Sequence, residues 1–384
     1  MSKWLKILFT FWAIIGMSLP ALAQLQFETR APFALLMDYQ SGTVLFQKQA
    51  DARMEPASMA KMMTIALTFR MLKNGSLSMD DEFFISEYAW REGGASSGGS
   101  TMFAKLNSKI SVENLLKSVI IQSGNDASIA LAEGIGGTEE TFALMMNEMA
   151  QEIGLKNSNF TNATGLPDEN MYVTARDLAN LARYIIREFP QYYAIFSEPS
   201  FEWNKIKQSN RNTLLKMGIG VDGLKTGFTE SSGYGEVVSS AQGGRRIIAV
   251  LHGMETMKQR SEEARKLVSW GTRSFENLLA FDSGEIVNKV PIYGGEISHV
   301  ELVGEGAINL YLPKGSRKCL SAKIIYSSPI LPPVEAGDEI AKLQVSCNKQ
   351  IIQTTPLFAE QSVARGNLVR QATDALKELA LGWM

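Results

Sequence analysis

Three short segments with nucleophilic and basic side chains follow one another along the chain. Ser58 and Lys61 stand three residues apart, a Ser-Gly-Asn segment begins at Ser123, and a Lys-Thr-Gly segment begins at Lys225. A serine hydroxyl is a poor nucleophile near neutral pH, so it needs a positioned base and donors that stabilise the oxyanion formed on attack. The pattern therefore predicts a serine nucleophile with a lysine as its proton partner, and Lys61 is the first candidate.

The other polar residues of these segments have complementary chemistry. A lysine acts as a base only if burial or nearby cations lower its pKa, and Lys225 can supply such a positive neighbour. Ser123 offers a hydroxyl for proton relay, and Asn125 offers an amide for a substrate carbonyl. Lys225 and Thr226 can hold an anionic group, while Gly227 lets a substrate backbone approach closely. Taken alone, each segment also has a structural explanation: the Ser58–Lys61 spacing can occur by chance, the segment at Ser123 can cap a helix, and the segment at Lys225 can be a turn.

Composition argues against other kinds of site. The 384-residue chain has only two histidines, His252 and His299, and neither has a neighbour at a ligand spacing, so no metal and no cofactor are predicted. His252 lies in an apolar segment typical of a buried strand, so we interpret it as structural, and His299 likewise. The net charge is −2 and the basic residues are dispersed, which excludes nucleic acid as an expected partner.

The first 23 residues have the pattern of an export signal. Lys3 and Lys6 stand at the N-terminal end of an apolar run over residues 5–19, and Ala23 completes a small-x-small ending. This pattern predicts cleavage after Ala23. The alternative is a retained membrane anchor, but the apolar run is short for a span of about 20 residues.

The predicted elements around the three segments form one α+β domain. Residues 33–48 have the pattern of a hairpin, and Pro56 opens a helical pattern that places Ser58 in its first turn and Lys61 on the same face. Helical patterns follow at 112–121, 126–133, 139–153 and 174–189, then strands at 233–240 and 246–253, then a helix over 258–279. Strands on both sides of a helical block predict a single sheet closed by both ends of the domain.

Short alternating strands separated by glycine and proline follow residue 281. They lie at 286–291, 308–312, 322–327, 340–346 and 351–356 and predict a small all-β domain without a catalytic constellation, which suits a spacer or docking module. Cys319 and Cys347 both fall in this part of the chain. They can form one disulfide after export, or remain two buried thiols.

The last segment, residues 363–384, has the pattern of an amphipathic helix that ends in Trp383 and Met384. Such a helix can lie in a membrane interface. The alternative is a helix docked on its own protein or on a partner, and the mixed charges of the polar side weaken the attraction to anionic lipid.

Together, the order, spacing and context of the three segments resemble those of the penicillin-binding proteins and serine β-lactamases. The chain is most similar to the low-molecular-mass D-alanyl-D-alanine carboxypeptidases, on residues 56–62, 122–127, 164–166 and 221–227, the β domain and the amphipathic tail. The resemblance implies an α+β, β-lactamase/transpeptidase-like catalytic domain built on an antiparallel sheet. The predicted division is a signal peptide at 1–23, a catalytic domain at 24–280, a β-rich domain at 281–362 and a membrane-associating helix at 363–384.

The resemblance also implies a reaction. Ser58 attacks the carbonyl between the two terminal D-alanines of a peptidoglycan stem peptide, and Lys61 takes its proton. D-alanine leaves after receiving a proton through Ser123, water hydrolyses the acyl-enzyme, and β-lactam antibiotics trap the same serine. The expected location is the periplasm, with the C-terminal helix on the outer face of the cytoplasmic membrane.

The same resemblance assigns the substrate-binding residues. Lys225 and Thr226 would hold the substrate carboxylate, with Arg260 as a second carboxylate partner, and Gly227 and Asn125 complete the binding set. Backbone N–H groups of Ser58 and of the strand after Lys225 would form the oxyanion hole.

Two departures from the family pattern limit this transfer. Phe228 stands where some relatives carry histidine, and residues 157–176 lack the Glu-x-x-Leu-Asn pattern of class A β-lactamases, which argues against efficient penicillin hydrolysis. Arg211 is treated as a solvated surface charge outside the site. The alternatives to a carboxypeptidase are a D,D-endopeptidase or a β-lactamase with the same residues, or an inactive envelope scaffold.

Overall fold

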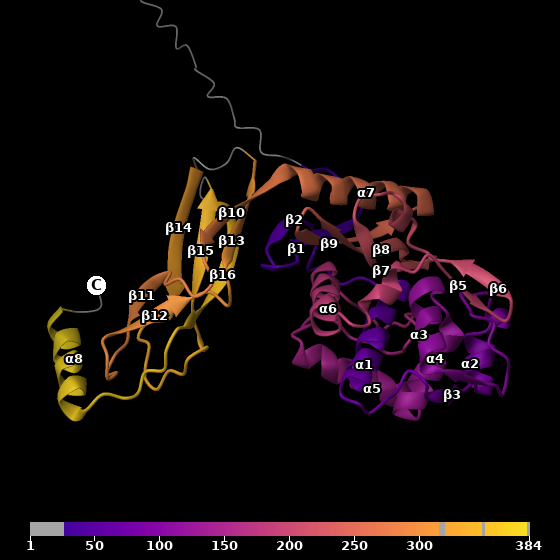
Figure 1. The fold of residues 1–384 in the computed structure, drawn as a ribbon, viewed down its shortest axis with the longest axis horizontal. Helices are drawn as coiled ribbons and strands as arrows, with labels where there is room; N and C mark the ends of the chain where they lie inside the picture. The colour runs from indigo at the N-terminus through magenta and orange to yellow at the C-terminus, as the bar shows by residue number, and fades with distance from the viewer. Residues whose placement is uncertain (1–26, 315–318, 348–349, 382–384) are drawn as a thin grey trace, which may run out of the picture.

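The chain folds into a larger α+β domain, a smaller β domain and a terminal helix (Figure 1), which confirms the predicted fold class. The structure, a computed structural model, describes residues 27–314, 319–347 and 350–381. The signal peptide predicted over residues 1–23 lies outside the described residues. No helix among the described residues is long and apolar enough to cross a membrane.

A five-stranded antiparallel sheet forms the centre of the first domain, with strand order β2-β1-β9-β8-β7. Because β1 pairs with β9, the two ends of the domain close one sheet, as predicted. Leu35 and Leu36 are both fully buried, on opposite faces of β1, so the strand lacks the alternation of a half-exposed sheet. The strands are β1 (Phe33–Asp38), β2 (Val44–Lys48), β7 (Val221–Thr229), β8 (Gly233–Gln242) and β9 (Arg245–Met254).

Helices cover both faces of this sheet. α7 (Met257–Ser274) packs on β8 and β9 on one face, and the other helices lie on the opposite face (Figure 1). α1 is buried along almost its whole length, because other helices surround it. The remaining helices are α1 (Lys61–Lys73), α2 (Glu87–Glu92), α3 (Val112–Lys117), α4 (Asn125–Gly136), α5 (Glu139–Glu152) and α6 (Ala175–Glu188), with short 3₁₀ helices at Ala57–Ala60, Ala95–Ser97, Tyr193–Ser197 and Thr213–Lys216.

Two small two-stranded antiparallel sheets flank the helical layer and were absent from the predicted elements. They are β3 (Glu82–Phe84) with β4 (Lys109–Ser111), and β5 (Ser200–Trp203) with β6 (Ile206–Ser209). Each strand has three or four residues and at most one buried side chain. Strands this short and exposed leave little hydrophobic alternation in the sequence.

The β domain holds a second antiparallel sheet, with strand order β11-β12-β16-β15-β14, and the pair β10-β13. Its strands are β10 (Phe275–Phe281), β11 (Asn288–Pro291), β12 (His299–Val303), β13 (Ile308–Pro313), β14 (Leu320–Tyr326), β15 (Glu339–Cys347) and β16 (Gln350–Ala359). Cys319 and Cys347 form a disulfide beside the β14–β15 pair, which decides between the two alternatives left open by the sequence. The terminal helix is α8 (Leu368–Leu381).

The helix predicted over 258–279 is wrong at its end. α7 stops at Ser274, and the next seven residues form β10, which pairs with β13. Apolar residues at 275, 278, 279 and 281 fit either a helix or a strand, so periodicity alone did not separate them. Because β10 pairs with β13 and so belongs to the β domain, we propose that the first domain ends at Ser274.

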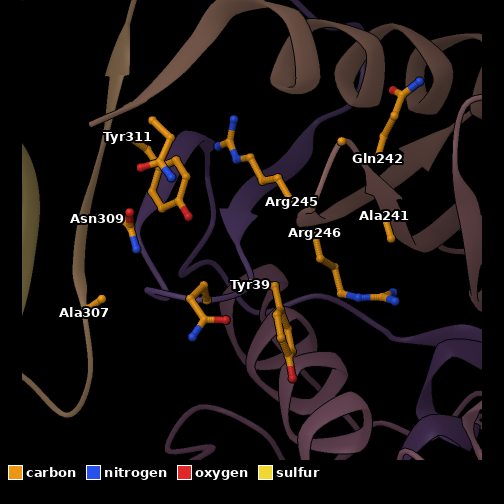
Figure 2. A pocket seen from close by; sticks show the side chains of 12 residues that line it. Tyr39, Ala241, Gln242, Arg245, Arg246, Ala307, Asn309 and Tyr311 are labelled. Carbon is orange, nitrogen blue, oxygen red and sulfur yellow. The ribbon is translucent and has the colours of Figure 1, made fainter. Parts of the chain in front are cut away.

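An arginine joins the two domains (Figure 2). Arg245, at the start of β9, places its Nε 3.2 Å from a carboxylate oxygen of the fully buried Asp38. Its guanidinium also lies 4.3 Å from the centre of the Tyr311 ring on β13. A pocket of about 550 Å³ opens beside this contact. Asp38 and Arg245 belong to the first domain and Tyr311 to the second, so the cation–π contact fixes one domain against the other.

We expect Arg245→Ala to lower the free energy of unfolding by about 2–3 kcal/mol, because it leaves Asp38 buried without its cation and removes the contact with Tyr311. Urea titration followed by circular dichroism measures the change. Lys258→Ala is the matched control, since Lys258 is 85% exposed and lies 3.9 Å from its partner Glu262, and it should stay within about 0.5 kcal/mol of wild type. Equal effects of the two substitutions would contradict the assigned role of Arg245.

Candidate active site

Ser58 lies in a tight turn that presents its hydroxyl next to α1. The 3₁₀ helix Ala57–Ala60 carries Ser58, and Ala57 before it has a φ of 49°, in the left-handed region that costs energy for a residue with a Cβ. A Cβ at Gly227 of β7 would lie 3.1 Å from the Pro56 carbonyl oxygen, so glycine there allows the strand to approach the turn. The sheet thus supports the serine turn from behind.

Lys61 begins α1 and directs its amine back to Ser58. The Lys61 Nζ atom lies 3.1 Å from Ser58 Oγ, 2.7 Å from Asn125 Oδ1 and 2.5 Å from the carbonyl oxygen of Thr164. The side chain is fully buried. Three oxygens therefore surround the amine, and they hold it in contact with the serine.

The loop before α6 supplies the third of these oxygens. The side-chain oxygen of Asn162 accepts hydrogen bonds from the N–H groups of Thr164 and Gly165 at 3.1 and 2.8 Å. This contact fixes the Thr164 carbonyl opposite Lys61. A backbone carbonyl has no residue signature, so sequence reasoning did not identify Thr164 as part of the site.

Ser123 and Lys225 form a second pair across the cleft. Lys225 Nζ of β7 donates to Ser123 Oγ at 2.9 Å and to the Thr226 carbonyl at 3.1 Å. Ser123 follows a π-helical turn, Ser118–Gln122, that continues α3, and it has a left-handed φ of 68°. Strained backbone of this kind persists where the surrounding structure holds it in place. The two predicted lysines thus each contact one of the two predicted serines.

Gly124 and Asp126 set the shape of the segment between Ser123 and α4. A Cβ at Gly124 would lie 2.3 Å from the Ser118 hydroxyl oxygen, so the aspartate of the β-lactamase pattern would fit here only if Ser118 shifted. The buried Asp126 carboxylate accepts from Thr101 Oγ1 at 2.6 Å and from the N–H groups of Met102 and Ala104. Asp126 thereby holds the 100–104 loop against α4, a role that its sequence position did not reveal.

Burial governs the charges of the two lysines. Desolvation lowers the pKa of Lys61 to about 7, against an opposing effect of the Glu139 and Asp126 carboxylates. The pKa of Lys225 is lowered well below its usual value, first by burial and then by the cations of Lys61 and Arg211. A substantial fraction of Lys61 is therefore neutral near pH 7, as a general base requires.

An open cleft of about 760 Å³ lies in front of these residues. Ser58, Ser123, Asn125, Thr226, Gly227 and Arg260 line it, so the predicted site residues meet in one place, with Lys61 and Lys225 buried beneath. Arg211, which sequence reasoning left out as a surface charge, also lines the cleft. Phe228, at the position where some relatives carry histidine, lines the cleft as well. It stacks on Tyr234 with ring centres 4.1 Å apart, so this side of the cleft is aromatic.

The two histidines lie elsewhere. His252 is buried in β9, as predicted, and burial lowers its pKa to about 4, so it is neutral at pH 7. His299 is exposed at the start of β12, where its Nδ1 forms a hydrogen bond with Ser298 Oγ at 3.0 Å, so it is hydrogen-bonded and not packed in the core.

Comparisons with known proteins agree with this geometry. A family described as D-alanyl-D-alanine carboxypeptidase (peptidase S11) matches residues 21–256, and the C-terminal domain of penicillin-binding protein 5 matches residues 275–365. The chain is 37% identical over 343 residues to the D-alanyl-D-alanine carboxypeptidase DacC of Escherichia coli, covering 88% of this chain and 86% of that protein.

Solved structures give the same result. Penicillin-binding protein 5 of Haemophilus influenzae superposes with a TM-score of 0.77 at 37% identity, covering 88% of this chain and 99% of that chain. Penicillin-binding protein D2 of Listeria monocytogenes, solved in its ampicillin-bound form, has a TM-score of 0.57 at 28% identity, covering 65% of this chain and 100% of that chain.

The fold and the paired Ser–Lys contacts define the class of penicillin-binding serine enzymes. Within it, this chain belongs to the D-alanyl-D-alanine carboxypeptidase family, on a match that spans more than half of its residues. The predicted class of enzyme, a serine-type carboxypeptidase, is confirmed.

The rate of acylation should depend on the protonation of Lys61. Because only the neutral amine can take the Ser58 proton, we expect the rate to rise about tenfold per pH unit below pH 7 and to level off above it. Stopped-flow labelling by a fluorescent penicillin between pH 5.5 and 9 measures this profile. Glu139→Gln removes a charge that raises the Lys61 pKa and should move the midpoint to lower pH. A flat profile would exclude Lys61 as the base.

Proposed function

We propose that this carboxypeptidase removes the terminal D-alanine from peptidoglycan stem peptides through an acyl-enzyme on Ser58. The single observation that carries the assignment is the buried Lys61 amine in contact with Ser58 Oγ. Neutral Lys61 takes the hydroxyl proton as Oγ bonds to the carbonyl carbon between the two D-alanines. The negative charge that develops on the carbonyl oxygen is stabilised by backbone N–H groups of Ser58 and of the strand after Lys225.

Ser123 completes the first half of the reaction. Its hydroxyl gives a proton to the nitrogen of the departing D-alanine as the C–N bond breaks, and Lys225, which donates to Ser123 Oγ, replaces that proton. Lys61 then releases the proton that it took from Ser58, and Lys225 takes one up from solvent, so both amines regain their starting states. Water adds to the acyl carbon and gives a proton to neutral Lys61, which passes it to the Ser58 oxygen as the ester bond breaks. The site returns to its starting state, with free D-alanine and the shortened stem peptide as products.

Positive side chains at the cleft match the carboxylate of the terminal D-alanine. Thr226, Arg260 and Arg211 line the cleft, and Lys225 lies directly beneath it. A guanidinium binds a carboxylate through two parallel hydrogen bonds, which fixes the peptide end in one orientation. Asn125 can bind a peptide carbonyl at the same time as it holds Lys61.

β-Lactams should acylate Ser58, and the resulting ester should be hydrolysed slowly. Their carboxylate suits the same cationic residues, and the Listeria relative binds ampicillin. Among the described residues that line the cleft there is no Asp or Glu. Without a carboxylate to activate water, hydrolysis of the penicilloyl ester lacks the base on which class A β-lactamases depend.

Ser58→Ala should abolish covalent labelling by fluorescent penicillin and reduce release of D-alanine from a pentapeptide at least about 1000-fold, because it removes the only atom that forms the ester. Gel fluorescence and amino-acid analysis measure the two activities. Ser96→Ala changes an exposed serine outside the cleft lining and should leave both unchanged. Labelled Ser58→Ala protein would place the nucleophile elsewhere.

The terminal helix supports a proposal about location. Leu368, Val369 and Leu376 of α8 are 82%, 73% and 65% exposed, while Asp374 accepts a hydrogen bond from the Gly294 N–H of the β domain. One side of α8 is thus attached to the protein, and apolar side chains remain uncovered. We propose that this face lies in the outer surface of the cytoplasmic membrane and that the mature protein is periplasmic, where the Cys319–Cys347 disulfide can persist.

Deletion of residues 368–384 should release the protein from membranes, because it removes the exposed apolar face and keeps the buried Val363, whose backbone pairs with Val334. Sedimentation with phosphatidylethanolamine/phosphatidylglycerol vesicles measures binding. Leu368→Asp should weaken binding. Ile351→Asp, which changes an exposed apolar residue on β16 outside α8, should not. Full sedimentation of the truncated protein would refute the assignment.

A further inference from the structure

A buried carboxylate lies behind the cationic part of the cleft and has no place in the reaction described above. Glu236 on β8 is fully buried. Within the described part of the chain, neither of its carboxylate oxygens accepts a hydrogen bond. Its contact with a charged group is an ion pair, in which Glu236 Oε2 lies 3.4 Å from Arg260 Nε. A carboxylate this isolated from water is costly, so its partner matters.

The sheet register places Glu236 directly under the carboxylate-binding residues. Glu236 pairs with Thr226 across β7 and β8, so the two side chains stand on the same face of the sheet. That face is covered by α7, which carries Arg260. Lys225, next along β7, points to the opposite face, where it contacts Ser123. Thr226, Glu236 and Arg260 therefore form one cluster at the edge of the cleft.

Arg260 is held from two sides in this cluster. Only 4% of its surface is exposed, yet it lines the cleft. Its Nε faces Glu236, and one terminal nitrogen donates to the Arg211 carbonyl oxygen at 3.3 Å. A guanidinium has five N–H donors in a fixed plane, so fixing its Nε edge determines where the terminal nitrogens point.

We propose that Glu236 is a positioning residue for substrate recognition: it orients Arg260 so that the free edge of the guanidinium meets the terminal carboxylate of the peptide. This role rests on the proposed function of the cleft. Glu236 also neutralises part of the charge of Arg260, Arg211 and Lys225, which lie near one another and repel. Burial raises the pKa of Glu236 to about 7, and the Arg260 and Lys225 cations oppose that rise.

Two thioester substrates separate this role from a structural one. Both carry the same N-acyl-D-alanyl group, which forms the same acyl-enzyme on Ser58. In one the leaving group is mercaptoacetate, whose carboxylate stands in for that of the terminal D-alanine. In the other it is the uncharged methyl ester of mercaptoacetate. Release of thiol gives kcat/KM for each substrate, and their ratio measures recognition of the carboxylate alone.

We expect Glu236→Leu to lower kcat/KM about 10- to 100-fold for the charged thioester and less than about threefold for the neutral one, because a misplaced guanidinium affects only the carboxylate. Arg260→Ala should produce the same selective loss, and the double variant should lose no more than Arg260→Ala alone. Glu236→Gln should recover part of the ratio, because a side chain of the same shape keeps an oxygen beside Arg260 Nε.

Glu263→Gln is the matched control. Glu263 is a buried carboxylate on α7 that binds Lys266 and Thr29 and does not line the cleft, so its loss should leave the substrate ratio at the wild-type value. An equal fall with both thioesters in Glu236→Leu, or additive losses in the double variant, would overturn the proposal. Failure of the wild-type protein to release thiol from either substrate would instead refute the proposed function.

Discussion

The first domain depends on one interaction: the buried amine of Lys61 contacts three oxygen atoms and is shielded from water. Moving a charged amine out of water costs several kcal/mol, and the neutral form is favoured only as long as water stays out. Lys61 meets that condition by binding oxygens from three segments: the serine turn, the start of α4 and the loop before α6. Asn125 and Thr164, which lie 64 and 103 residues from Lys61 in the chain, therefore cannot shift away from it without exposing the amine or leaving it without partners.

The second constraint is the pleat of β7. Successive side chains of a strand point to opposite faces, so adjacent residues serve different partners. Lys225 reaches Ser123 on the helical face, while Thr226 shares the α7 face with Glu236. One strand thus supplies both the proton route and the carboxylate-binding part of the cleft. A one-residue slip of β7 against β8 would exchange these two environments.

The sequence was sufficient for those parts of the site that depend on residue type and local spacing. Ser58 and Lys61 are one helical turn apart, so their contact follows from the helix geometry. The sheet closed by both chain ends was also predictable, because apolar strands bracket the helical block. The Thr164 carbonyl, the Asp126 support and the Glu236–Arg260 pair were not, because each depends on a tertiary contact without a periodic pattern. The end of α7 was missed for a related reason: the apolar residues after Ser274 suit two kinds of element.

The arrangement of the two domains has a geometric consequence. The cleft borders β7 and α4, while α8 lies beyond the β domain, at the other side of the molecule (Figure 1). Arg245 ties the two domains together through Asp38 and Tyr311. If α8 lies at a membrane surface, as we propose, the β domain sets the distance between that surface and the cleft. The stem peptides within reach would then form a layer parallel to the bilayer, selected by distance as well as by chemistry.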